Sequence, residues 1–366
     1  MPERSLPAFV LALVGADFGE LSNTLQLLEG TRVRARILLA PSLHAQNSNL
    51  ANLADLAVDP LRSLEQVLAV IRTERPRVLL LMSGYFMAAH RLLARHDLET
   101  ILQAARAMGA CVVTSDPLLG HAAQVADAAA VHDLLANDVH VHLAPAPAGP
   151  LHQACHNPRL VLTPPQRAAL WARLGEIGIE AGMPFWLFVL SGMDYRVQCR
   201  LLGRTRLDAR LQALGRQTRA AGCQPVFIVP PLACESLSGE AGGSALALAS
   251  CDHLRFRALL LHAQHLFYWN LLSNSVLARV ANGGSVFFFD DGHLARFVPT
   301  LLPVALEGYY RNARLPRLDP AQALDARALA KGAADQPATF APALQALRAL
   351  PTPDQWFERL LEKVQP

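Results

Sequence analysis

Continuous apolar runs alternate with helix-like segments along the first 145 or so residues of this sequence. Residues 9–14, 33–41, 77–84 and 110–116 are strand-like, and amphipathic segments such as 61–76 lie between them. Most of these runs do not alternate apolar with polar residues, which is typical of parallel strands covered by helices on both faces. The intervening helices have the length of right-handed crossover connections. The sequence therefore predicts an α/β fold.

A proline-rich stretch at residues 143–150 interrupts this pattern, and a second α/β set follows it. Strand-like runs return at 184–192, 224–231 and 285–293, with a shorter candidate at 262–269. A segment with this proline content cannot continue a helix or a central strand. We therefore predict two Rossmann-like domains that face each other across a cleft, where ligands would bind.

The C-terminal end carries a helix signature of its own. Thr352 suits the N-cap position, Pro353 the first helical position and Gln355 the third. The segment before it, from residue 318 to 353, is rich in Ala and Pro and is expected to run over the surface. The predicted domains are residues 1–150, residues 151–317 and a C-terminal tail of residues 318–366.

Composition bounds the class of protein. Hydrophobic residues make up 52% of the 366 residues and charged residues 17%, which allows a large buried core. A net charge of +3 without a dense Lys/Arg block gives no support for binding nucleic acid. The apolar runs are shorter than the roughly 18 residues of a membrane-spanning helix, and the first residues do not resemble a signal peptide. We therefore predict a cytoplasmic protein, whose six cysteines, without a CxxC pair, are buried thiols.

The first predicted strand ends in the sequence GADFGELSN, at the place where open α/β sheets bind ligands. Gly15 and Gly19 permit tight turns and close approach of a substrate. Asp17 or Glu20 could act as a general base on an acceptor hydroxyl. We favour Asp17, because Glu20 or Ser22 could instead cap the following helix. The spacing of the glycines does not match the dinucleotide-binding fingerprint.

Two later strand-end loops are also polar. The first leads into a helix whose free N-terminal amides, with hydroxyls beside them, favour a phosphate or diphosphate. The second follows a buried strand that delivers its acids to the same edge of the sheet. The alternative is that the serines cap a core helix and the acids lie in a solvated loop. The candidates are Asn270, Ser273, Asn274 and Ser275 in the first loop, and Asp290, Asp291 and His293 in the second.

Three further loops hold candidates. Asp194, Tyr195 and Arg196 follow the first strand of the second set, and Arg196 could pair with phosphate oxygens. Tyr85 and Asp116 lie at strand ends of the first set and could line the acceptor side, although turn chemistry also explains them.

The thirteen histidines are scattered along the chain. His140 and His142 would share one face if their segment is a strand. A metal site needs more ligands than this pair, so we predict no bound metal.

The second half resembles the donor-binding half of GT-B glycosyltransferases. The segment that carries this resemblance is WNLLSNSVLARVANGGSVFFFDDGH. The first half resembles their acceptor domain, with GADFGELSN in the place of the loop that carries the catalytic base. The resemblance implies transfer of a sugar from a nucleotide-sugar donor to an unknown acceptor, without a metal or other cofactor. It also implies that the helix at 353–363 packs back on the first domain.

The sequence departs from the retaining branch of that family, because no acid lies in or just before the segment 274–282. An inverting mechanism is therefore the better hypothesis. Two alternatives remain open on the same architecture. One is an enzyme similar to nucleotide-sugar 2-epimerases, and the other is a catalytically inactive partner or scaffold protein.

Overall fold

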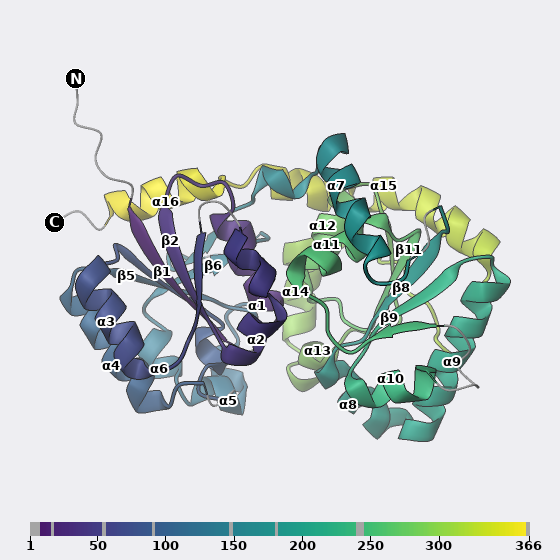
Figure 1. Ribbon diagram of the computed structural model, residues 1–366, viewed down its shortest axis with the longest axis horizontal. Helices are drawn as coiled ribbons and strands as arrows, with labels where there is room; N and C mark the ends of the chain where they lie inside the picture. The colour runs from purple at the N-terminus through teal and green to yellow at the C-terminus, as the bar shows by residue number, and fades with distance from the viewer. Residues whose placement is uncertain are drawn as a thin grey trace. The chain divides into compact units, whose positions relative to one another are not determined.

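The computed structural model describes residues 8–15, 18–52, 56–89, 92–145, 149–179, 182–238 and 245–363. The chain divides into two compact units, each built around one parallel sheet (Figure 1). The first unit combines Met1–Pro158 with Ala346–Pro366, and the second is Arg159–Gln345. The predicted α/β class with two parallel sheets is confirmed.

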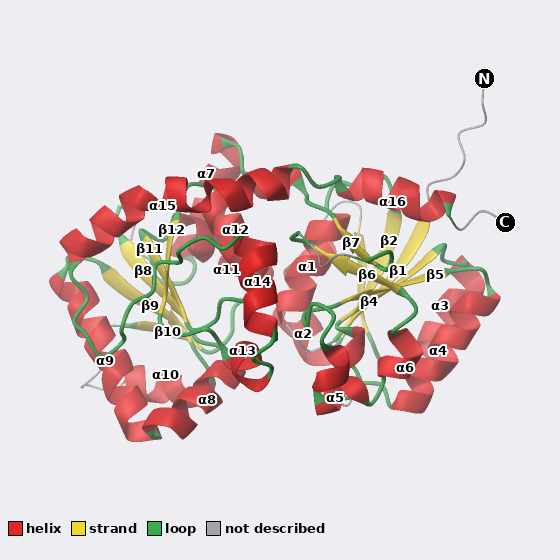
Figure 2. Ribbon diagram, turned by 180° about the vertical axis from the view of Figure 1, so that it is seen from behind, coloured by secondary structure: helices red, strands yellow, loops and turns green. Residues whose placement is uncertain are grey.

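The first unit contains a seven-stranded sheet in the order β3-β2-β1-β4-β5-β6-β7, with helices on both faces (Figure 2). Every residue of β1 and β4 is buried, which explains their continuous apolar sequences. The strands are β1 (Phe9–Val14), β2 (Arg34–Leu39), β3 (Leu56–Pro60), β4 (Val78–Met82), β5 (Cys111–Ser115), β6 (Val139–His142) and β7 (His152–Ala154). The helices are α1 (Phe18–Leu28), α2 (Pro41–Gln46), α3 (Leu64–Glu74), α4 (Arg95–Ala107), α5 (Ala126–Ala129), α6 (His132–Leu135) and α16 (Pro353–Glu362).

The second unit contains a five-stranded parallel sheet in the order β10-β9-β8-β11-β12. Its strands are β8 (Phe185–Val189), β9 (Gln224–Ile228), β10 (Leu246–Leu248), β11 (His265–Tyr268) and β12 (Ser285–Phe288). Its helices are α7 (Pro164–Gly175), α8 (Gly192–Leu202), α9 (Arg204–Ala220), α10 (Pro231–Ser238), α11 (His253–His262), α12 (Asn274–Ala281), α13 (His293–Phe297), α14 (Leu301–Tyr310) and α15 (Ala326–Arg348).

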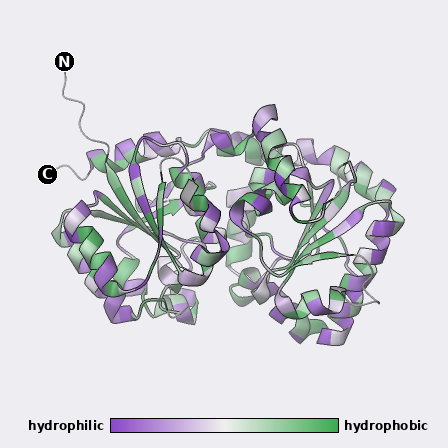
Figure 3. Cartoon of the chain, viewed as in Figure 1, coloured by the Kyte–Doolittle hydropathy of each residue, from purple (hydrophilic) through white to green (hydrophobic). Residues whose placement is uncertain are grey.

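The core of the second unit is aromatic. Phe188 stacks on Phe227 with ring centroids 4.7 Å apart and on Phe267 at 4.6 Å. Each of these rings comes from a neighbouring strand, so the row of rings runs across the sheet. Hydrophobic residues concentrate on the strands of both units (Figure 3). The apolar strands therefore form the core of each unit, and the loops at their carboxyl ends are attached to it.

The C-terminal segment differs from the single tail predicted at 318–366. The unit boundary falls at residue 345, so most of α15 belongs to the second unit. Most residues of this helix are exposed, so the segment does run over the surface, but Leu329 and Phe340 are 2% and 1% exposed, so one face of the helix is buried. Gln336 exchanges two 2.8 Å hydrogen bonds with the backbone of Val286, which covers the open edge of β12. An edge strand with unpaired backbone groups explains why the segment docks there.

The last helix, α16, belongs to the first unit. The predicted capping box is confirmed, because Thr352 and Gln355 exchange backbone–side-chain hydrogen bonds around Pro353. Trp356 is buried among the residues of the first core, and its Nε1 donates to Gln153 over 2.9 Å. The first unit also reaches residue 158 rather than 150, since β7 joins its sheet.

Among the helices in the described ranges, none has both the length and the apolar character needed to cross a membrane.

Candidate functional site

Both sheets have a point where the strand order reverses, and the loops of a parallel sheet leave in opposite directions there. The reversal lies between β1 and β4 in the first unit and between β8 and β11 in the second. Ligands of open α/β sheets bind in the crevice at such a point, outside the carboxyl ends of the strands. The loops after these strands are therefore the places to look for a site in each unit.

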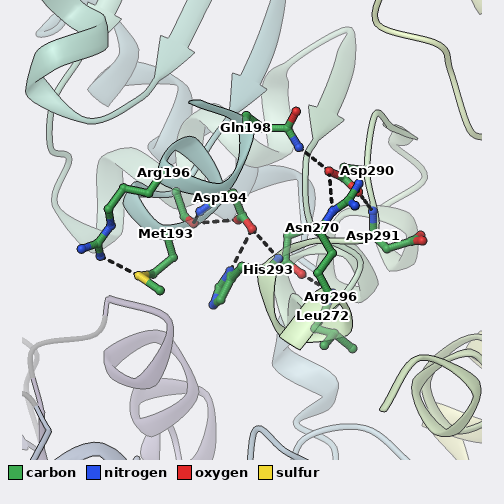
Figure 4. Close-up of polar contacts among 11 residues, drawn as sticks. Met193, Asp194, Arg196, Gln198, Asn270, Leu272, Asp290, Asp291, His293 and Arg296 are labelled. Carbon is green, nitrogen blue, oxygen red and sulfur yellow. Dashed lines mark hydrogen bonds and ion pairs between the residues drawn. The ribbon is translucent and has the colours of Figure 1, made fainter. Parts of the chain in front are cut away.

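His293 in the second unit is held by a buried carboxylate. Its Nδ1 and its backbone N–H both lie 2.8 Å from one oxygen of Asp194 (Figure 4). The side chain of Asp194 is 3% exposed, and its other oxygen accepts from the hydroxyl of Ser191 over 2.6 Å. A carboxylate only accepts, so Nδ1 carries a proton, and in the neutral form of the ring the lone pair is on Nε2. No hydrogen bond from a described residue reaches Nε2, and the ring, 17% exposed, has the arrangement of a general base.

The two acids before His293 are engaged in ion pairs. Asp290 binds the guanidinium of Arg296 with both oxygens, over 2.7 and 3.2 Å, and also accepts from the amide of Gln198. Asp291 pairs with Arg317. From the sequence, both acids were predicted to bind a ligand. In the structure their carboxylates fix the loop that carries His293.

The loops after β11 and β12 interlock. The side-chain oxygen of Asn270 accepts from the backbone N–H of Leu272 over 2.8 Å, and the N–H of Leu271 donates to Asp291 O over 3.2 Å. Gly292 packs against this turn with φ +95°. A Cβ at this position would lie 2.5 Å from the Asn270 oxygen, so only glycine fits.

The start of α12 presents hydroxyl groups and helix amides. The Ser275 hydroxyl lies 2.6 Å from the Tyr268 hydroxyl and 2.6 Å from that of Ser273. Ser273 occupies the N-cap position but its side chain does not cap the helix. The backbone amides of the first turn of α12 point out of its N-terminal end, which carries the positive end of the helix dipole and attracts anions. The arrangement suits a phosphate or diphosphate group.

The prediction that Tyr195 and Arg196 share the site with Asp194 does not fit the structure. Tyr195 is 5% exposed and belongs to the apolar core, with its hydroxyl 3.5 Å from Asp208. Arg196 is exposed, donates to the sulfur of Met193 and points away from His293 in Figure 4. Successive residues of a helix are turned by about 100°, so three neighbours in α8 cannot face one site.

In the first unit, Asp17 lies outside the described residues. Gly15 is buried directly after β1, and Gly19 is exposed in the first turn of α1. Glu20 is 5% exposed, and its carboxylate accepts from the hydroxyl of Ser115 over 2.8 Å. That hydroxyl in turn accepts from the backbone N–H of Ser83 over 2.7 Å. Glu20 thereby links the carboxyl ends of β1, β4 and β5.

A cluster of histidines lies at the same edge of this sheet. The Tyr85 hydroxyl is 2.6 Å from His140 Nε2, and the His140 ring stacks on His152 with centroids 4.8 Å apart. His142 Nε2 is 3.1 Å from His152 Nδ1. Asp116 follows β5, and one possible ligand atom from each of Asp116, His142 and His152 lies within 4.8 Å of the other two. The structure thus brings Tyr85 and Asp116 together with three histidines.

Burial controls the protonation of this cluster. It lowers the pKa of His142 to about 3, and the neighbouring His152 and His140 add to the effect. Burial also raises the pKa of Tyr85 well above its usual value, with a smaller contribution from the charge of Asp116. At neutral pH the His142 imidazole is therefore uncharged and the Tyr85 phenol keeps its proton.

No protein-family model and no curated protein matches this sequence. A Listeria monocytogenes protein assigned as a UDP-N-acetylglucosamine 2-epimerase has 12% identity and a TM-score of 0.51, over 93% of this chain and 94% of that one. The UDP-GlcNAc 2-epimerase of Neisseria meningitidis bound to UDP-GlcNAc has 10% identity and a TM-score of 0.50, over 97% and 99%. The chain has the GT-B fold. MurG of Acinetobacter baumannii also aligns, over 98% and 99%, with 11% identity and a TM-score of 0.46.

The resemblance found in the sequence is therefore confirmed at the level of the fold. Two features of the sites were not predicted from the sequence. His152 lies just after the proline-rich stretch and belongs to the three-residue strand β7, which is too short to give a periodic signal. Ser191 was passed over as well, although Ser191 and Asp194 have the spacing of a helix cap, which the structure forms.

Proposed function

We propose that this chain is a glycosyltransferase that takes its sugar from a nucleotide-sugar donor. The observation that supports the proposal is the pairing of His293 with Asp194 at the same sheet edge as the hydroxyl-lined start of α12. The helix start offers a diphosphate group positive dipole ends and donors. The histidine offers a proton acceptor whose conjugate acid is stabilised by a buried carboxylate.

In the proposed reaction, an acceptor hydroxyl attacks the anomeric carbon of the donor sugar. The bond between that carbon and the diphosphate oxygen breaks, and the hydroxyl proton passes to His293 Nε2. The departing diphosphate carries the negative charge that the amides at the start of α12, with the Ser273 and Ser275 hydroxyls, would stabilise. Attack opposite the leaving group inverts the anomeric carbon.

A second candidate function is 2-epimerisation of a nucleotide sugar. It is favoured by the position of His293 and the start of α12 on one unit, because a base there could act on the sugar of the donor itself. Removal of the proton at C2 would expel the diphosphate from C1 and leave a C1–C2 double bond. Return of the proton to the opposite face of C2, with the diphosphate adding back to C1, would give the epimer without an acceptor. The two solved structures with the higher TM-scores carry the name of 2-epimerases, but at 10–12% identity they support the fold alone.

A ligand screen followed by product analysis separates these functions. A nucleotide sugar that binds only the folded chain, at 100 times its dissociation constant, should add about 2.7 kcal/mol to the free energy of unfolding. The hit is then incubated in D₂O and followed by NMR. Deuterium at C2 and a C2 epimer identify an epimerase. Release of nucleoside diphosphate that depends on an added acceptor identifies a transferase, and absence of any hit contradicts both functions.

The role of His293 is tested with His293→Asn and Asp194→Asn. Both variants should lose about 10²–10⁴-fold in turnover, because they remove the base or its orientation. Arg200→Ala, an exposed change in the same helix as Asp194, is the matched control and should keep full turnover. Full turnover of His293→Asn, with the fold verified by circular dichroism, would place the base elsewhere.

A further inference from the structure

We propose that Asp116, His142 and His152 bind a divalent first-row transition-metal ion at the edge of the first sheet. This inference is independent of the nucleotide-sugar hypothesis, since it uses none of the residues in the second unit. It differs from the prediction made from the sequence, in which only His140 and His142 were considered as ligands and no bound metal was expected.

The strand register brings the three ligands together. Ser115 pairs with Val141 across β5 and β6, so Asp116 and His142, one residue further along each strand, lie side by side. His140 pairs with His152 across β6 and β7, which places His152 on the same face as His142 and diagonally opposite it. The side chains that meet here are two imidazoles and a carboxylate, which are ligands of Zn²⁺ and its neighbours in the first transition row.

The spacing is close to that of a metal centre. A tetrahedral ion with bonds of about 2.0–2.1 Å holds its ligand atoms about 3.3 Å apart. His142 Nε2 and His152 Nδ1 are 3.1 Å apart and share one hydrogen bond, so one of the two nitrogens carries a proton that a metal ion would replace. The largest separation within the group is at most 4.8 Å, so the ligands must approach by roughly 1.5 Å at most.

The surroundings of the three side chains orient them and leave room for that movement. The backbone N–H groups of Leu118 and Gly120 donate to the two oxygens of Asp116, over 2.9 and 2.6 Å, and each oxygen keeps a second lone pair. The rings of His140 and His152 stack, which fixes the plane of the His152 imidazole. Gly120 lies beside the His152 ring. A Cβ at this position would lie 3.9 Å from the ring, and since glycine has none, that space is open. Contacts of this kind support metal ligands and tune their affinity.

Three protein ligands leave at least one coordination position for water or for an oxygen of a bound molecule. Structural zinc sites close all four positions with protein ligands, whereas catalytic sites keep one open. The inferred site therefore has the form of a centre that binds or activates a small oxygen ligand, and not the form of a structural site that stabilises the fold.

The test uses the full-length chain, treated with a chelator and then titrated with Co²⁺ and Zn²⁺. We expect one ion per chain and visible Co²⁺ bands without a thiolate charge-transfer band, since the ligands are nitrogen and oxygen. His152→Ala should lower the affinity by about 100-fold or more, because the loss of a direct ligand exceeds the 10–100-fold effect of an outer contact. His96→Ala, whose side chain is 82% exposed, is the control and should bind as the parent does.

A measurement on the unchanged chain guards against variants that do not fold. In nitrogen-15 spectra of the histidine rings, Zn²⁺ should shift His142 Nε2 and His152 Nδ1 and leave the ring of His96 unmoved. The proposal fails if no ion binds with a dissociation constant below about 10 μM, which corresponds to about 7 kcal/mol. It also fails if the bound Co²⁺ shows thiolate bands, or if these ring nitrogens do not shift.

Discussion

The tight contact at Gly292 predicts a loss of stability that can be separated from ordinary glycine strain. Gly292 has φ +95° and ψ 166°, a conformation in which residues other than glycine cost about 1–3 kcal/mol. A Cβ there would also lie 2.5 Å from the Asn270 oxygen and 2.9 Å from the Asn270 Cα. The second of these atoms is backbone, so the loop itself must move.

The clash adds a second cost. Displacing Asn270 breaks its hydrogen bond to Leu272, worth about 0.5–1.5 kcal/mol, and overpacking typically costs about 1–3 kcal/mol more. Gly292→Ala should therefore lower the free energy of unfolding by about 2.5–7.5 kcal/mol. Gly203→Ala is the matched control, because Gly203 has φ 80° and ψ 144° but no atom within 4 Å of an added Cβ. It should lose only the strain, about 1–3 kcal/mol.

The assay is urea denaturation followed by tryptophan fluorescence, in which buried Trp186 and Trp269 report on the second unit. The expected result is a larger loss for Gly292→Ala than for Gly203→Ala, with equal denaturant slopes. In a verified activity assay, Gly292→Ala should also impair turnover, since the residue precedes His293. Equal losses for the two variants would refute the interlocking of the two loops.

Three further changes test the structure. Arg279 is 3% exposed and donates to five carbonyl oxygens. In urea denaturation, Arg279→Met should therefore lower the free energy of unfolding by about 3–5 kcal/mol, and Arg279→Lys should lower it by less. Equal losses for the two variants would show that the planar guanidinium group is not needed. Burial lowers the pKa values of His253 and His265 to about 4, and the unfolded chain binds more protons than the folded one below pH 6.5. The contribution of these two neutral histidines to the free energy of unfolding should therefore be fully present above pH 6.5. Below that pH, the free energy of unfolding should fall by about 1.4 kcal/mol per pH unit for each histidine, towards pH 4. A His253→Gln variant whose stability falls equally steeply would contradict this prediction. Ser115→Ala should cost about 2–3 kcal/mol, because it removes the hydroxyl that accepts from the buried N–H of Ser83 and donates to Glu20; an unchanged melting midpoint would contradict this prediction.

Local patterns were sufficient for the class of fold and for several element ends. The apolar run Phe9–Val14 is a fully buried parallel strand, as its lack of alternation predicts. The capping box at Thr352 and Gln355 forms as its spacing predicts. The loops after β11 and β12 were correctly singled out as polar strand ends, and they do touch. In each case the interaction spans a few residues or follows from one period.

Helical phase and burial set the limit of such predictions in α8. Asp194 and Tyr195 are neighbours in the sequence, but one reaches His293 and the other enters the core. The sequence marks both as polar residues after a strand. Which of them faces the loops depends on how the helix is rotated on the sheet, and that rotation is set by packing against α9 and the strands.

By itself, the sequence determined that this chain builds two parallel α/β sheets and which loops leave their carboxyl ends. Only the tertiary structure decided which side chains from those loops meet. Asp194 finds His293 across 99 residues, and Glu20 finds Ser115 across 95. Strand order and register bring Asp116, His142 and His152 to one place. The physical reason is that periodicity reports the burial of each element, whereas the partners of a side chain depend on which strands pair and in what register, and these are set by long-range packing of the whole sheet.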